Sequence, residues 1–383
     1  MKYVKSISTI TAFALGIAIL GGIGSVALDR YVIPTFADAP IFSRFGFLKK
    51  ATENTTIINK TEQLIVREDD SVEKITSQPS TAVVKIMSTI HGTHTLRGDG
   101  VTLRSGSGVL VTNDGLIITS KDAILENARY TAVLFNGAVH TMELVGSDPY
   151  TNLVYMKIDA TNVPAISFSN SDDLRTGKRL IALSVGNSDY QDQFSLAMLN
   201  GKDQTYSLSE KTVSSSEKHE GMFLVDFPHQ EKYVGGPVIN YNGEMIGLMT
   251  ATTIDNQHQY VVLPANIVKE SLDTYLNSHF SKRPTLGVYY KSITKDIQSA
   301  YNLKKDAGAW LYSPTGKTYL TIIAGSPAEK AKLQANDIIT AINDTAITLD
   351  MPLSRIISHH EKGETIQLHV WRNEQEIVIP VTL

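Results

Sequence analysis

Short apolar runs with a period of two fill residues 82–277 and constrain the fold more than any other feature of the chain. Alternation of apolar and polar residues is typical of strands that bury one face. So many short strands in one stretch predict antiparallel barrels, because closing a sheet leaves no bare edge. The runs are residues 83–86, 108–111, 116–119, 131–135, 141–145, 153–158, 179–185, 222–225, 237–240, 245–250 and 259–263.

Turn and helix signals add detail to this region, which we assign to a domain of residues 80–280. Asn136-Gly137 and Asn242-Gly243 each stand between alternating segments, and Asn-Gly is a strong signal for a two-residue hairpin loop. The apolar spacing becomes helical from Pro264 to Asn277, where we expect a helix that closes the domain.

Residues 283–383 form a second unit in which helical and strand patterns are mixed. Ser326 can cap a helix, Pro327 suits its first position, and Glu329 can reach back in a capping box. The other predicted elements are a strand at 337–342, an amphipathic helix at 352–359, and strands at 365–371 and 376–383.

The N-terminal segment predicts a membrane span. Residues 6–28 carry no charge and are long enough, at about 1.5 Å per helical residue, to cross a hydrocarbon core of about 30 Å. Lys2 and Lys5 precede this segment, which favours a cytoplasmic N-terminus and extracytoplasmic domains. We therefore expect residues 1–30 to be a retained single-pass anchor in the cell membrane. A cleaved signal peptide is the alternative, because Ala37-Asp38-Ala39 resembles a cleavage site.

Residues 31–79 have mixed polarity and a charge-rich end, which is typical of a linker or arm. Short alternations at 56–59 and 64–66 fit either an edge strand or an extended tether.

Composition excludes several classes of function. The formal net charge of −4 is spread along the chain without a basic block, so we expect no nucleic-acid binding. The chain has no cysteine, which excludes disulfides and thiolate metal sites. Neither His359-His360 nor the pair His91 and His94 has a carboxylate at ligand spacing, so we expect no metal and no other cofactor.

Four segments, taken in order, resemble the HtrA family of DegP- and DegS-type serine proteases. The resemblance covers about residues 55–383 and implies a mainly β fold: a trypsin-like double barrel of six antiparallel strands each, then an α+β PDZ domain at 283–383. The segments are Gly106 to Thr119 (a strand pair of the first barrel), Gly146 to Ile158 (the aspartate segment), Gly235 to Asn240 (the end of the serine loop) and Gly325 to Asp337 (the PDZ helix).

Carried over position by position, the family's catalytic triad is substituted throughout. Its histidine falls on Asp122, its aspartate on Asn152 and its serine on Val234. Asp122 cannot act as an imidazole, Asn152 brings no negative charge, and Val234 has no atom able to attack a carbonyl. Lys232 replaces the usual glycine of the oxyanion loop, and we expect it to disturb the backbone geometry that an oxyanion hole needs.

The resemblance therefore implies a serine endopeptidase fold without catalytic residues. A replacement dyad of Lys121 or Lys232 with a nearby serine is the alternative, and it would make the chain an active serine-type endopeptidase with an unusual active site.

The PDZ resemblance implies a peptide-binding site. PDZ domains add a peptide C-terminus as a strand and hold its carboxylate with backbone amides. Leu353, Ile356 and Ile357 are candidates for the groove helix, or are simply core. The residues that resemble the carboxylate-binding loop and its strand are Thr285, Leu286, Gly287, Val288 and Tyr289.

Together these features predict a membrane-anchored, catalytically silent scaffold that binds peptide C-termini or misfolded proteins, or modulates active HtrA proteases, in extracytoplasmic protein quality control. The resemblance implies a homotrimer or a mixed trimer with an active relative. A purely structural protein with a vestigial groove is a further hypothesis.

Overall fold

The computed structural model describes residues 68–91, 101–186, 192–207, 213–254, 257–278, 280, 283–313 and 320–383. All elements below belong to one unit, Arg67–Leu383. The predicted membrane span and most of the predicted linker lie outside the described residues. Within the described ranges, no helix has the length and apolar character that a membrane crossing requires.

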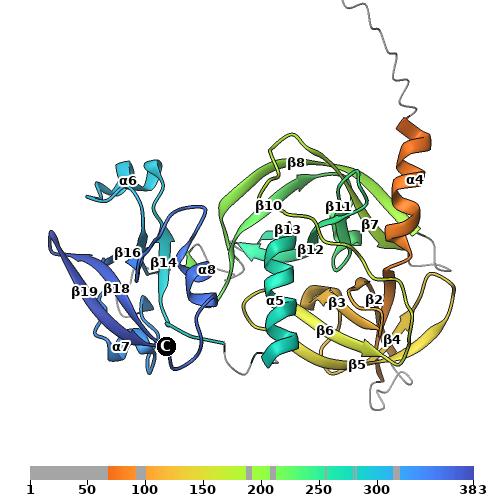
Figure 1. Cartoon of the computed structure of the whole chain (residues 1–383), viewed down its shortest axis with the longest axis horizontal. Coiled ribbons are helices and arrows are strands. Elements are labelled where there is room, and N and C mark those ends of the chain that lie inside the picture. Colours follow the sequence, from red (N-terminus) through yellow and green to blue (C-terminus); the bar gives the residue numbers. More distant parts are fainter. Residues whose placement is uncertain are drawn as a thin grey trace, which may run out of the picture. The chain divides into compact units, whose positions relative to one another are not determined.

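The first barrel closes six antiparallel strands in the order β1-β2-β3-β6-β5-β4 (Figure 1). The predicted Asn136-Gly137 turn joins β4 to β5. Ile86, Ile117 and Met156 are fully buried inside the barrel. The strands are β1 (Val83–His91), β2 (Val101–Leu110), β3 (Leu116–Ser120), β4 (Arg129–Val133), β5 (Val139–Asp148) and β6 (Leu153–Ile158).

The second barrel closes in the order β10-β13-β12-β11-β7-β8. Helix α5 (Ala265–Ser278) follows it, close to the predicted range, and buries Val268 and Leu272 in a core cluster that includes residues of both barrels. The mainly β prediction with two six-stranded barrels is confirmed. The strands are β7 (Arg179–Val185), β8 (Asp192–Ser207), β10 (Glu220–Asp226), β11 (Pro237–Ile239), β12 (Met245–Ile254) and β13 (Gln257–Pro264).

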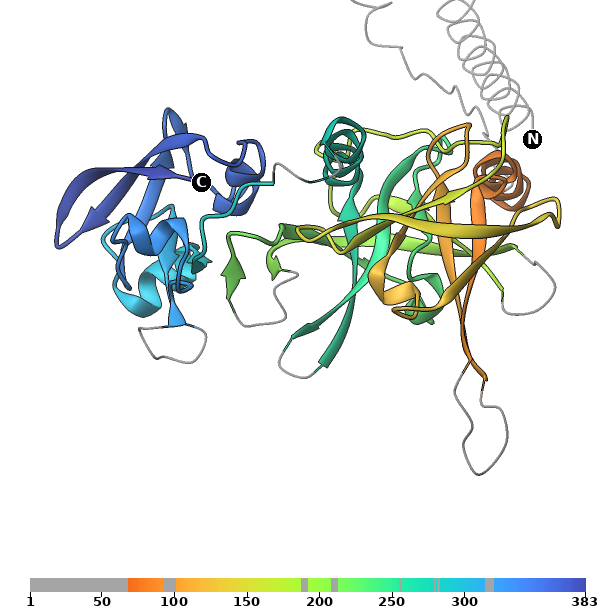
Figure 2. The same cartoon turned by 90° about the horizontal axis from the view of Figure 1, so that it is seen from below.

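Helix α4 (Glu68–Ser80) precedes the first barrel, at the end of the segment expected to be a linker. Val72 is buried in the core cluster of the barrels, and Ile75 packs against the same cluster. Helix α4 therefore caps the barrel core, as α5 does. Figure 2 shows α4 (orange) and α5 (teal) nearly end-on beside the strands.

The C-terminal domain is built on a sheet in the order β19-β18-β16-β15-β14-β9, with β17 beside β16. The edge strand β9 (Ser214–Ser215) comes from the segment between β8 and β10 of the second barrel, not from the C-terminal domain. The other elements are β14 (Tyr289–Ser292), β15 (Ala309–Leu311), β16 (Ile338–Ile342), β17 (Thr345–Ala346), β18 (Thr365–Arg372), β19 (Gln375–Thr382), α6 (Lys295–Tyr301), α7 (Pro327–Lys330) and α8 (Leu353–Ser358).

Helix α7 begins as the sequence predicts, with one difference at its cap. Ser326 Oγ accepts a hydrogen bond from the Glu329 amide at 3.2 Å. Glu329 reaches back to the amide of Gly325 at 2.7 Å, one residue before the position that a standard capping box uses.

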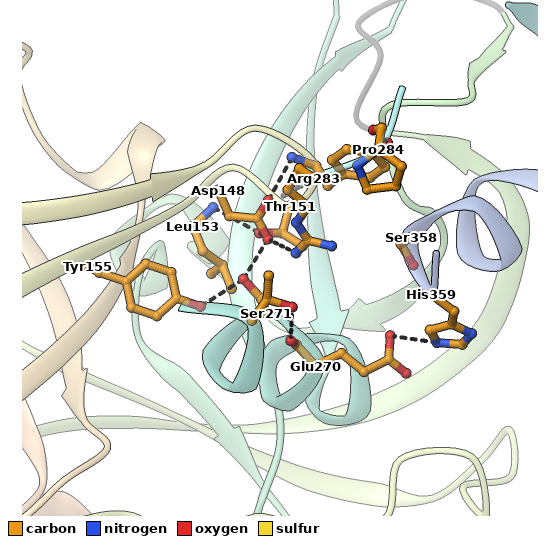
Figure 3. Close-up of polar contacts among 12 residues, drawn as sticks. Asp148, Thr151, Leu153, Tyr155, Glu270, Ser271, Arg283, Pro284, Ser358 and His359 are labelled. Carbon is orange, nitrogen blue, oxygen red and sulfur yellow. Dashed lines mark hydrogen bonds and ion pairs between the residues drawn. The ribbon is translucent and has the colours of Figure 1, made fainter. Parts of the chain in front are cut away.

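A buried ion pair joins the barrels to the start of the C-terminal domain (Figure 3). The Asp148 carboxylate lies 2.7 Å from the Arg283 guanidinium, and the two side chains are 0% and 8% exposed. Asp148 also accepts hydrogen bonds from Thr151 Oγ1 at 3.0 Å and from Ser271 Oγ on α5. The hydroxyl of Tyr150 donates to the Pro284 carbonyl. This network fixes β5, α5 and residues 283–284 to one another.

Candidate functional site

A cavity of about 640 Å³ lies between residues of the two barrels. Its lining includes Asp122 and Val234, two of the three positions that resemble the triad, together with Lys232. Asn152, the third position, does not contribute to the lining. The structure therefore brings two of the predicted positions to one cleft.

Asp122 belongs to a 3-10 helix, η2 (Lys121–Ala123). Its Oδ2 accepts from Ser120 Oγ at 3.1 Å, and from Thr250 Oγ1 and the Ala251 amide of β12 at 3.3 and 3.4 Å. The carboxylate thus acts as an acceptor that ties η2 of the first barrel to β12 of the second.

Asn152 has a left-handed backbone conformation with φ of 58°, which asparagine tolerates better than most residues. Its Oδ1 accepts from Lys218 Nζ at 2.8 Å, and its carbonyl accepts from the Lys121 amide at 2.9 Å. The Asn152 side chain is therefore engaged with the segment that precedes β10.

The loop that carries Val234 places an apolar side chain in the cleft and uses a backbone amide inside the loop. Residues Gln230–Tyr233 form a 3-10 helix, η3, after His229, whose φ is 56°. The Lys232 amide donates to the His229 carbonyl at 3.0 Å. Because that N–H is used inside the loop, it is not directed into the cleft, where an oxyanion donor would have to point.

Gly235 has a packing role in this loop that does not depend on catalysis. Its φ is 84°, and a Cβ at this position would lie 2.2 Å from the Ser107 carbonyl oxygen. Its amide donates to the Met249 carbonyl at 2.8 Å. The glycine packs the loop against β2 and β12, which is a structural role.

The predicted peptide-binding loop lies at the start of the C-terminal domain. Gly287 has φ of 84°, and a Cβ there would meet Ser326 Cβ at 2.2 Å, so only glycine fits. Thr285 is exposed and Tyr289 half-buried, whereas Leu286 and Val288 are fully buried.

The apolar residues for which the sequence left the groove helix and the core open are buried in the core. Leu353, Ile356 and Ile357 of α8 are between 0% and 4% exposed and belong to the hydrophobic cluster of the C-terminal domain.

Sequence reasoning missed two residues that contact this loop. Glu217 Oε1 accepts from the amides of Leu286 and Gly287 at 2.9 and 2.6 Å, and Ser216 Oγ accepts from the Val288 amide at 3.0 Å. Residues 213–217 read Val-Ser-Ser-Ser-Glu and carry neither a periodic pattern nor a turn signal. Nothing local in the sequence therefore marks their partner, which lies about 70 residues away.

His219, in the same segment, is a buried histidine beside Tyr150. The two rings are 5.9 Å apart, and His219 Nδ1 has no hydrogen-bond partner among the described residues. Burial lowers the pKa of His219 to about 4. A neutral imidazole is the form that the folded chain holds at neutral pH.

Because His219 is buried in its neutral form, we expect the folded chain to lose stability in acid. Between pH 6.5 and about 4 the unfolded chain binds the proton and the folded chain does not, so the stability from His219 is full above pH 6.5 and lost as pH falls. We expect the free energy of unfolding to fall by about 2 to 3 kcal/mol more in the wild type than in His219→Phe between pH 7 and pH 4.5. Urea unfolding at the two pH values measures the difference, and equal losses would contradict it.

Comparison with known proteins gives two domain matches. The trypsin-like peptidase domain family matches residues 106–248, and the PDZ domain family matches residues 284–383. The fold and the cleft thus define a trypsin-like peptidase domain followed by a PDZ domain.

Relatives and solved structures agree with this class. Proteins described as "Probable periplasmic serine endoprotease DegP-like" from Chlamydia trachomatis and Rhizobium meliloti are 29% and 27% identical over 73% and 70% of this chain. The matches cover 53% and 51% of those proteins, so this chain spans about half their length. The HtrA-type protease AlgW, solved with a decapeptide and with a tripeptide, shares the fold at TM-scores of 0.61 and 0.63. The sequence identity to this chain is 21% in both structures. Each match covers 80% of this chain, and the two matches cover 96% and 95% of the AlgW chains. Together the matches relate residues 106–248 to trypsin-like peptidase domains and residues 284–383 to PDZ domains.

Proposed function

We propose that this chain is a catalytically silent HtrA-type protein that acts by binding peptides. The observation that carries the proposal is the loop at residues 229–236. Val234, which the sequence resemblance aligns with the family's nucleophile, lines the cleft, and the Lys232 amide donates to the His229 carbonyl. Acyl transfer needs a hydroxyl or thiol nucleophile and preorganised donors for the oxyanion; Val234 supplies no nucleophile, and the Lys232 amide is engaged elsewhere.

The PDZ domain supports the binding half of the proposal. The amides of Leu286, Gly287 and Val288 converge on carboxylate and hydroxyl oxygens of residues 216–217, which is the chemistry that captures a peptide C-terminus. In this proposal the chain is anchored by residues 6–28 and holds free C-termini or unfolded proteins outside the cytoplasmic membrane. It works as a homotrimer or in mixed trimers that modulate active relatives.

An active serine-type endopeptidase is the second candidate. The retained cleft of about 640 Å³ and the serine endoprotease descriptions of the relatives favour it. A lysine dyad would have to use Lys232, which lines the cleft, because Lys121 Nζ lies 2.7 Å from Glu126 Oε1 in an ion pair.

Casein hydrolysis by the purified full-length chain separates the two candidates. We expect no cleavage above that of a Lys232→Ala, Ser105→Ala double variant, which removes the cleft lysine and a serine of the cleft lining. Cleavage by the wild type that disappears in this variant would favour the endopeptidase. Failure of any C-terminal peptide to bind would favour a purely structural role.

A further inference from the structure

The PDZ sheet receives its edge strand from the barrel domain. Strand β9 pairs antiparallel with β14, with Ser215 opposite Tyr289 and Ser214 opposite Tyr290. The Ser216 amide continues the ladder by donating to the Val288 carbonyl at 3.1 Å. Residues 214–216 therefore lie along β14 as an added strand, which is how PDZ domains bind peptides.

The segment also runs in the direction of a bound peptide, and it ends at the carboxylate-binding loop. It runs from Ser214 toward Glu217, so its C-terminal side meets the loop. Glu217 Oε1 accepts hydrogen bonds from the amides of Leu286 and Gly287. The side-chain carboxylate of Glu217 thus stands where the main-chain carboxylate of a peptide C-terminus would bind.

Buried polar contacts hold the segment in place. Glu220 is 4% exposed, and its carboxylate accepts from Ser214 Oγ at 2.6 Å and from Tyr290 OH and Ser292 Oγ at 2.7 Å each. Ser214, Ser215 and Ser216 are buried as well, whereas Glu217 is half-buried and lines a cavity of about 470 Å³ with Gly287 and Tyr289. The carboxylate end of the segment is therefore the part that an incoming ligand reaches first.

We propose that Ser214–Glu217 is an internal ligand of the PDZ groove, and that a peptide with a free C-terminal carboxylate binds only by displacing it. The inference rests on the peptide-binding function proposed above and adds a way in which that binding is regulated. Because only chains with the segment released can bind, the apparent Kd is the intrinsic Kd divided by the released fraction.

A disulfide lock tests the displacement directly, since the chain contains no cysteine. Ser215 and Tyr289 face each other across the ladder, and facing pairs have Cβ atoms about 4.5 to 5.5 Å apart, close enough for a disulfide after a small shift. The probe is a fluorescein-labelled hexapeptide pool, random at five positions and ending in valine with a free carboxylate. The same pool with C-terminal amides is the control ligand, and fluorescence anisotropy with the full-length chain is the readout.

We expect the oxidised Ser215→Cys, Tyr289→Cys variant to bind no probe and the reduced form to bind it. Glu217→Ala should bind at least about tenfold more tightly than the wild type, since its released fraction is larger. Glu143→Ala, which removes an exposed carboxylate on β5, should behave as the wild type. The amidated pool should bind every form weakly.

The outcomes distinguish the two levels of the proposal. Equal binding by the oxidised and reduced forms, or by Glu217→Ala and the wild type, would overturn the internal ligand and leave the peptide-binding function standing. Absence of binding by every form, Glu217→Ala included, would overturn the peptide-binding function and displacement with it.

Discussion

Restoring the three triad side chains is expected to give a poor enzyme until Lys232 is also replaced by glycine. In the variant Asp122→His, Asn152→Asp, Val234→Ser, the Lys232 amide still donates to the His229 carbonyl. Loss of one oxyanion donor typically costs about 10²- to 10³-fold in rate. Adding Lys232→Gly should therefore raise the rate of reaction with a fluorophosphonate probe by about 10²-fold or more. Glycine lets the backbone amide at position 232 turn toward the cleft.

The matched control is Lys232→Ala in the same restored background. Alanine removes the long side chain and its charge but retains the backbone restriction of a residue with a Cβ. We expect it to react as slowly as the lysine form. If glycine and alanine accelerate the reaction equally, the lysine side chain limits the site and the backbone of η3 does not.

Loss of Arg283 is expected to produce the largest destabilisation among single substitutions at the domain junction. Arg283→Ala leaves the fully buried Asp148 carboxylate without its counter-ion. Breaking a buried pair from one side costs about 3 to 5 kcal/mol. Thermal or urea unfolding followed by tryptophan fluorescence measures the change, and Trp310 and Trp371 both lie in the C-terminal domain.

Arg129→Ala on β4 is the matched control, because Arg129 is exposed. We expect it to change the free energy of unfolding by less than about 0.5 kcal/mol. A loss of under about 1 kcal/mol for Arg283→Ala would show that the remaining donors to Asp148 suffice to hold its charge.

Much of the barrel fold could be predicted because short apolar runs mark the strands that line the core. Strands β6 and β7 begin and end where the predicted runs do, and their residues are buried almost continuously. Strand β8 could not be found in this way, because its large apolar residues face outward. Phe194, Leu196 and Met198 are 54%, 48% and 47% exposed, while Ala197 and Leu199 are buried. Asn200-Gly201, usually a turn signal, continues the strand.

Helix α4 was missed for a different reason. Val72 and Ile75, spaced three apart, make the buried contact amid many charged neighbours, so the composition of the segment resembled a linker.

The candidate cleft could be predicted at the level of side-chain chemistry but not of backbone geometry. The expected substitutions at Asp122 and Val234 follow from the sequence resemblance, whereas the hydrogen bond of the Lys232 amide to the His229 carbonyl appears only in the fold. The contact between Glu217 and the loop at Gly287 could not be predicted either, because the two residues are 70 positions apart in the chain. Pairings of such long range leave no local pattern.

Covalent labelling of the purified, unmodified full-length chain with a fluorophosphonate serine probe tests the central claim most directly. A chain without an activated hydroxyl should show no increase in mass after incubation. The fourfold variant that also carries Lys232→Gly should gain one probe adduct, on the hydroxyl that the Val234→Ser substitution introduces. A stoichiometric adduct on any residue of the unmodified chain would contradict the claim that it is catalytically silent.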